Sequence, residues 1–92
     1  MSWTHQAASS LREIHDYIAR TRPLTAQRTV ESLLDRTLSL ASAPRNAPRY
    51  HAHPEVRILR YGHFRLAYTI REEDDTVIIL MVFHGLVFLP FT

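Results

Sequence analysis

Cysteine is absent from the 92 residues, lysine is absent as well, and glycine occurs only twice. Without cysteine the chain has neither a disulfide framework nor thiolate chemistry, so nothing in it indicates an oxidising compartment. The sequence also has no long hydrophobic run. The longest, Val77 to Phe83, is far shorter than the roughly 20 residues of a membrane-spanning helix. The N-terminus lacks the basic-then-apolar layout of a signal peptide. We therefore expect a cytoplasmic protein with no membrane partner.

The length predicts a single domain over residues 1–92. A chain this short buries only roughly 60 to 65% of its unfolded surface, so its stability is marginal without help from a partner.

All eleven cationic residues are arginine, and their distribution is uneven. Residues 45–71 hold six arginines and one acid, a net charge of +5, whereas residues 72–92 hold four acids and no base. An arginine cluster binds phosphates or carboxylates through its planar fork, so nucleic acid or an acidic protein segment is a plausible partner. The alternative is a set of solvated strand arginines in a chain that uses arginine in place of lysine.

Two hydrophobic stripes with helical spacing precede the arginine cluster. Ala7, Leu11, Ile14 and Ile18 predict one helix, with Thr4 as its N-cap and an end near Arg20 to Pro23. Residues Val30, Leu33, Leu34, Thr37, Leu38 and Ala41 predict a second helix that opens around Thr25 and closes before Pro44. The short link between them makes an antiparallel helix hairpin.

The second half of the chain changes to a period of two. Residues 44–54 contain three prolines and are expected to form an extended loop, followed by a short strand from Val56 to Arg60. Residues 64–71 alternate, which predicts a strand with one core face and one cationic face. The run 77–83 is apolar throughout, as expected of a central strand covered on both faces. The predicted fold class is α+β, a helix hairpin packed on a small antiparallel sheet in the order α-α-β-β-β.

The residues that carry a family resemblance are now in view. They are Trp3-Thr4 before the first helix, Tyr17-Ile18-Ala19, Leu38 to Pro44, the stretch VRILRYGHFRLAYTI and the closing VFHG. Together they resemble the RelE/ParE toxin superfamily of bacterial type II toxin–antitoxin modules, and they are most similar to its ParE (plasmid stabilisation) branch. The resemblance implies a first strand before the hairpin. Only residues 1–4 are available for it, so we expect this strand to be very short or missing.

The resemblance implies a toxin that a cognate antitoxin neutralises, with two competing activities. ParE-like members act on DNA gyrase by protein–protein contact, and RelE-like members cleave mRNA on the ribosome. Ribonuclease chemistry needs a base, a cation for the phosphorane and an acid on one surface. Arg65 matches the nuclease arginine, His84 falls where some nucleases place a histidine, and Glu55 would have to be the base. Gly85 replaces the tyrosine that follows this histidine in such members.

These gaps lead us to predict no catalytic residues and to expect gyrase inhibition, with mRNA cleavage as the alternative and a decayed toxin as a third. His84 is then a strand-end residue, and direct nucleic-acid binding is not expected outside a toxin–antitoxin complex. The pair His51 and His53 has H-x-H spacing but few acids nearby, so we expect no metal, and no cofactor.

A helix hairpin and three strands offer too little surface to cover the large apolar side chains after Gly85. We therefore predict that this apolar tail forms part of an interface. Whether the toxin forms a homodimer or a heterotetramer with the antitoxin stays open. The predicted partner-binding residues are Arg57, Arg60, Arg65, Leu86, Phe88, Leu89 and Phe91.

Overall fold

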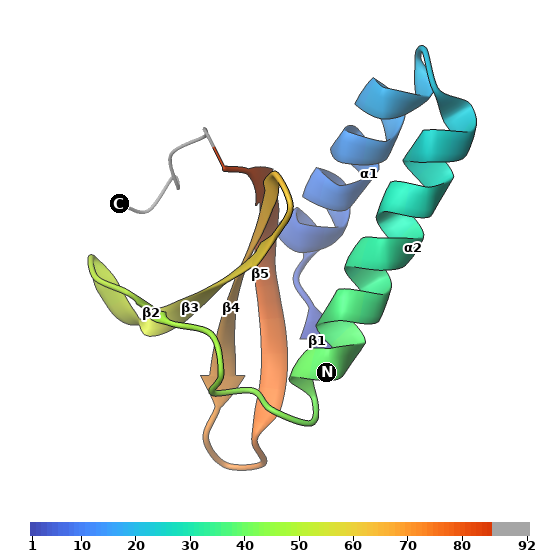
Figure 1. Ribbon diagram of the computed structural model, residues 1–92. Helices are drawn as coiled ribbons and strands as arrows, with labels where there is room; N and C mark the ends of the chain where they lie inside the picture. Colours follow the sequence, from blue (N-terminus) through green and yellow to red (C-terminus); the bar gives the residue numbers. More distant parts are fainter. Residues whose placement is uncertain (86–92) are drawn as a thin grey trace.

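The computed structural model describes residues 1–85. This part folds into a helix hairpin beside one twisted sheet (Figure 1). In chain order the elements are β1 Ser2–Trp3, α1 His5–Ala19, α2 Pro23–Leu40, β2 Arg49–Tyr50, β3 His53–Tyr61, β4 Phe64–Arg71 and β5 Thr76–His84. The predicted α+β class and the helix hairpin are confirmed, as are the strands over residues 64–71 and 77–83. The strand that was predicted as short, Val56 to Arg60, extends over His53–Tyr61.

The start of each helix is set by one residue, an N-cap threonine for α1 and a first-turn proline for α2. The Thr4 hydroxyl accepts the Ala7 backbone N–H at 3.0 Å, which confirms the predicted N-cap of α1. Pro23 stands in the first turn of α2, where its missing N–H costs nothing, and Arg22 before it has left the helical region at φ −140°. The second helix therefore starts two residues earlier than Thr25. The first helix packs against both α2 and β5.

The sheet has the strand order β1-β5-β4-β3-β2. Its first strand is present, although it has two residues and pairs in parallel with Ile78 and Ile79 of β5. The sheet is therefore mixed, and the expectation of a purely antiparallel sheet was wrong. Arg49–Tyr50 also forms a strand inside the predicted loop, because its prolines flank this dipeptide and leave its N–H groups free to pair with β3.

The pairing of β4 with β5 contains a bulge. Ala67 pairs with Met81 and Tyr68 with Ile79, so Leu80 lies between them without a partner on β4. A bulge shifts the alternation of side chains along the strand by one position. Val82 consequently points toward the helices, where strict alternation from Ile79 would have placed Met81 and Phe83.

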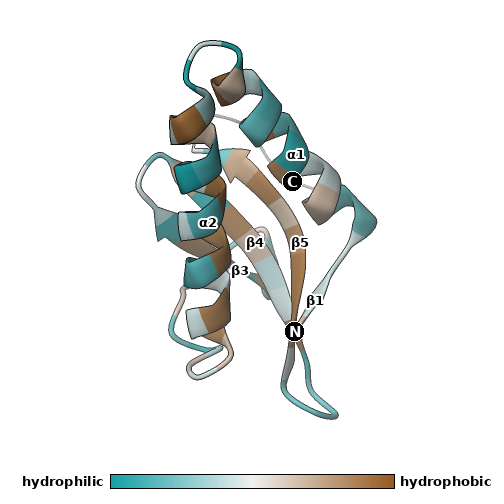
Figure 2. Ribbon diagram, turned by 90° about the vertical axis from the view of Figure 1, so that its right-hand side faces the viewer, coloured by the Kyte–Doolittle hydropathy of each residue, from teal (hydrophilic) through white to brown (hydrophobic). Residues whose placement is uncertain are grey.

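The two faces of the sheet carry separate apolar clusters. The face under the hairpin contributes Leu66, Tyr68 and Ile79 to the main core, together with Leu33 of α2. Figure 2 shows the hydrophobic residues concentrated along β4 and β5. We call the opposite side of the sheet the distal face.

The distal face holds a smaller cluster around Val56, Ala67 and Phe83. The predicted cationic face of β4 was therefore only partly right, since Ala67 at its centre is fully buried. β5 is an interior strand between β1 and β4 with residues in both apolar clusters, as its apolar run predicted, and β4 lies in the middle of the five-stranded order.

A candidate partner-binding surface

Arg65 lies on the distal face between two cross-strand neighbours. It is directly opposite Arg60 on β3 and Phe83 on β5, and paired residues in a sheet project from the same face. Arg60 is exposed and Arg65 is half-buried. Two like charges directly opposite each other repel, so this arrangement destabilises the free sheet slightly and favours an anionic partner.

The guanidinium of Arg65 is held in a defined position. Its Nη1 donates to the Phe64 carbonyl at 3.0 Å and to the Gly62 carbonyl at 3.2 Å. It also lies directly over Gly85, where an added Cβ would be 3.0 Å from Arg65 Cζ and Nη2. Gly85 thus leaves room for the guanidinium, a role that the sequence interpretation missed because it depends on the pairing of β4 with β5.

The structure divides the six arginines of residues 45–71 into three pairs. Arg45 contacts Glu72 and Asp75 of the turn between β4 and β5, and Arg71 contacts Asp74 in the same turn. The hydrogen bonds from the Arg71 guanidinium and from Thr76 hold the pKa of Asp74 well below its usual range. The acids after residue 71 therefore neutralise two of the arginines.

A second pair of arginines donates to backbone carbonyls. Arg57 Nη1 donates to Ala47 O at 2.8 Å and to Arg45 O at 3.2 Å, while Arg49 donates to Pro54 O. Arg57 is opposite Tyr68, so it projects from the hairpin side of the sheet, away from Arg60 and Arg65. Arg57, one of the predicted partner-binding residues, thus supports the loop before β2.

Arg60 and Arg65 form the third pair, which we call the distal arginine pair. Within residues 1–85 neither of them has an ion-pair partner. They are consequently the arginines whose charge is available to another molecule on this face.

His84 lies on the other side of the sheet from Arg65. It is opposite Phe64, and its ring stacks on His63 with centroids 6.0 Å apart and meets the Phe64 ring edge-on. It lines a hollow of about 590 Å³ between α1 and the end of β5, together with Ile14, Ile18 and Met81.

Glu55 lies toward the opposite end of β3. It precedes Arg60 by five residues, which is roughly 17 Å along a strand, and its carboxylate is 3.5 Å from His53 Nδ1. Arg65, His84 and Glu55 therefore do not share one surface in this structure.

The remaining predictions concern the apolar tail, a metal site and a membrane segment. Leu86, Phe88, Leu89 and Phe91 lie outside the described residues. In residues 1–85 no three histidine or acidic side chains are grouped so that they would hold a metal ion. The same part of the chain contains no helix long and apolar enough to cross a membrane.

The fold and the distal surface define a small α+β protein with a cationic binding surface, and comparisons with known proteins identify its family. Residues 1–86 match the family described as "ParE toxin of type II toxin-antitoxin system, parDE", to which this chain therefore belongs. No curated protein matches the chain.

Solved structures give the same assignment. The chain is similar to one from the chromosomal ParDE toxin–antitoxin system of P. aeruginosa, with a TM-score of 0.77, 26% identity and coverage of 91% of this chain and 95% of that one. It is also similar to a chain of the toxin–antitoxin complex RelBE2 of Mycobacterium tuberculosis, with a TM-score of 0.68, 25% identity and coverage of 89% and 91%.

The isolated E. coli RelE toxin shares the fold, with a TM-score of 0.65, 17% identity and coverage of 91% of this chain and 81% of that one. The predicted RelE/ParE resemblance is confirmed. This chain is a type II toxin of the ParE/RelE family.

Proposed function

We propose that this toxin inhibits DNA gyrase in the cytoplasm by protein–protein contact, and that it binds its target and its antitoxin without a catalytic step. The observation that carries the proposal is the separation of the three residues needed for RNA cleavage. Arg65 projects from the distal face, His84 from the hairpin side, and Glu55 lies toward the far end of β3. General acid–base chemistry needs these groups within hydrogen-bonding reach of one phosphate.

The distal arginine pair supports a contact with an acidic protein surface. Arg60 and Arg65 present two planar forks side by side, and such forks bind carboxylates through two parallel hydrogen bonds. The Arg65 guanidinium is already oriented by Gly62 O and Phe64 O, so less side-chain freedom is lost when a partner binds.

A supercoiling assay with purified gyrase tests the proposal. Full-length toxin should inhibit supercoiling or accumulate cleaved DNA, and Arg60→Ala and Arg65→Ala should each weaken this effect about tenfold, since each removes one charged contact. Arg36→Ala is the matched control, because Arg36 is an exposed arginine on α2, away from the distal face. No effect of wild-type toxin at micromolar concentration would argue against gyrase as the target.

A ribosome-dependent mRNA endonuclease is the second candidate. It is favoured by the structural similarity to a RelBE2 chain and by Arg65, whose guanidinium would stabilise a phosphorane. Primer extension on transcripts after toxin induction should show new 5′ ends inside translated codons if this candidate is right. An SOS reporter in the same cells separates the two, because gyrase poisoning damages DNA and translational arrest does not. Growth without arrest would indicate a decayed toxin.

A further inference from the structure

The hollow between α1 and the end of β5 has an apolar wall that the proposed activity does not use. Its α1 side is formed by Ile14, Tyr17 and Ile18, which follow at intervals of three and four residues and share one face of the helix. Tyr17 is 72% exposed, and both isoleucines are half-buried. Figures 1 and 2 both show the helix hairpin extending past the end of β5. The last turns of α1 therefore project beyond the sheet with apolar side chains on view.

The chain leaves the sheet at the edge of this hollow. His84, the last residue of β5, lines it, and the Gly85 N–H beside it donates to His63 O at 2.8 Å. Residues 86–92 come next, with the sequence LVFLPFT, which has five large apolar side chains and no charged one. Seven residues reach at most about 25 Å. A short tether of this kind holds a segment at an effective concentration of roughly 1 mM, so even weak packing into the hollow would be populated.

The distal face offers an apolar segment no comparable place beside Gly85. Arg65 projects from that face, and its guanidinium lies directly over Gly85. Arg60 adds a second positive charge next to it. Apolar side chains that crossed onto the distal face would remove water from these two guanidinium groups without pairing them, which is costly. On the hairpin side the one acid that lines the hollow, Glu13, is exposed and can keep its water.

We propose that residues 86–92 fold back over the hairpin side of the sheet and fill this hollow with their apolar side chains. The segment would cover the faces of Ile14 and Ile18 that the strands leave half-buried, and removing this apolar area from water stabilises the packed arrangement. The packing would be the same whether the toxin acts on gyrase or on mRNA.

An engineered disulfide tests where the segment lies. The chain has no cysteine of its own, so a pair of introduced cysteines forms the only possible disulfide within it. Phe88→Cys is combined with Glu13→Cys at the hollow, or with Arg60→Cys on the distal face as the matched control, since both partner positions are exposed. In a glutathione buffer the hollow pair should show an effective concentration about tenfold or more above that of the control.

Three results of this experiment would overturn the proposal. They are equal effective concentrations for the two pairs, a preference for the distal pair, and disulfide-linked dimers in place of the closed monomer. The control is a lenient one, because Arg60→Cys also removes a charge that would keep the segment off the distal face.

Isoleucine methyl NMR of the full-length toxin gives a second measurement without cysteines. Phe88→Ala and Phe91→Ala each remove an aromatic ring, so they should shift the methyl resonances of Ile14 and Ile18, which line the hollow. Ile58 belongs to the apolar cluster of the distal face and should not move. Dispersed methyl resonances would show that both variants are folded. A shift at Ile58 alone would place the segment on the distal face, and no shift at any of the three would leave it in solvent; either result overturns the proposal.

Discussion

At the scale of single residues, Gly85 determines where the Arg65 guanidinium lies. Gly85→Ala would place a Cβ 3.0 Å from Cζ and Nη2 of Arg65, and the guanidinium is the flexible end that would move. We expect gyrase inhibition to fall about as far as in Arg65→Ala, roughly tenfold, with little change in stability. The Nε–H NMR resonance of Arg65 should shift.

Gly62 differs from Gly85, because it has φ +58° and open space around it. Gly62→Ala should therefore strain the turn and lower stability by about 1 kcal/mol. Unchanged inhibition in Gly85→Ala with a shifted Nε–H resonance would show that the orientation of Arg65 does not matter for the target.

Tyr68 is the buried polar anchor between the sheet and the loop after α2. Its hydroxyl donates to Pro44 O at 2.6 Å, and its side chain is fully buried. Tyr68→Phe leaves that carbonyl without its donor, so urea denaturation should show a loss of about 1–2 kcal/mol. Tyr61→Phe is the control, since Tyr61 is 37% exposed, and an equal loss there would contradict the explanation.

The pH dependence of stability gives a second measurement on Tyr68. Burial raises the pKa of Tyr68 above its usual 10.0, and the positive charge of Arg57 offsets part of this effect. In the unfolded chain the phenol ionises first, so its contribution to stability is complete below pH 10 and is lost as the pH rises through the folded pKa. The Tyr68→Phe protein should lose stability less steeply in this alkaline range.

At the scale of elements, Ser10 joins α1 to the edge of β5. Pairing with β1 ends at Ile79, and further along β5 the Val82 N–H donates to Ser10 Oγ at 3.0 Å. The same hydroxyl donates to Ala7 O at 2.8 Å. Ser10→Ala should cost about 1–2 kcal/mol despite the better helix propensity of alanine, because Val82 N–H loses its acceptor.

Ser9→Ala controls for this gain in helix propensity. Ser9 is half-buried on the same turn of α1, and its hydroxyl makes no hydrogen bond within residues 1–85. Thermal unfolding followed by circular dichroism should show a lower Tm only for Ser10→Ala. Equal melting of the two variants would mean that water replaces the hydroxyl.

The bulge at Leu80 explains why the sequence predicted the strands but not the face of the sheet from which His84 projects. Run lengths, turn residues and the alternation of residues 64–71 were enough to identify β4, and the Thr4 cap was equally readable. The run from Val77 to Phe83 is apolar at every position, so it carries no alternation from which a bulge could be inferred. Counting by twos from Ile79 would place His84 beside Arg65, and the extra residue turns it to the opposite face.

The state of each arginine between residues 45 and 71 likewise depends on tertiary contacts that the sequence does not reveal. Net charge along the chain predicted an excess of +5, but which arginines are neutralised depends on contacts between distant residues. Arg45 reaches an acid 30 positions away, and Arg57 binds a loop backbone. Only the register of β3 against β4 identifies Arg60 and Arg65 as neighbours.

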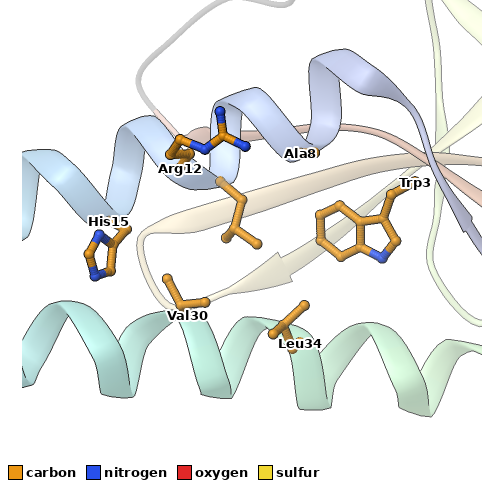
Figure 3. A pocket seen from close by; sticks show the side chains of 7 residues that line it. Trp3, Ala8, Arg12, His15, Val30 and Leu34 are labelled. Carbon is orange, nitrogen blue, oxygen red and sulfur yellow. The ribbon is translucent and has the colours of Figure 1, made fainter.

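At the scale of the whole molecule, the candidate surfaces are separate. The distal arginine pair lies on one side of the sheet, the hollow beside His84 lies between α1 and β5, and a groove lined by Leu11, Val30 and Leu34 lies between α1 and α2 (Figure 3). Single substitutions can therefore change one of these surfaces without altering the side chains of the other two.

The parallel pairing of β1 with β5 joins the first strand to the last strand that the structure describes. Thr4 donates from its hydroxyl to Leu80 O, and its N–H donates to Ile79 O, across about four-fifths of the chain. During synthesis these partners leave the ribosome only after almost everything else has been made, so the nascent chain cannot complete its core early. The last strand that the structure describes, β5, must therefore be synthesised before β1 can take its place in the sheet.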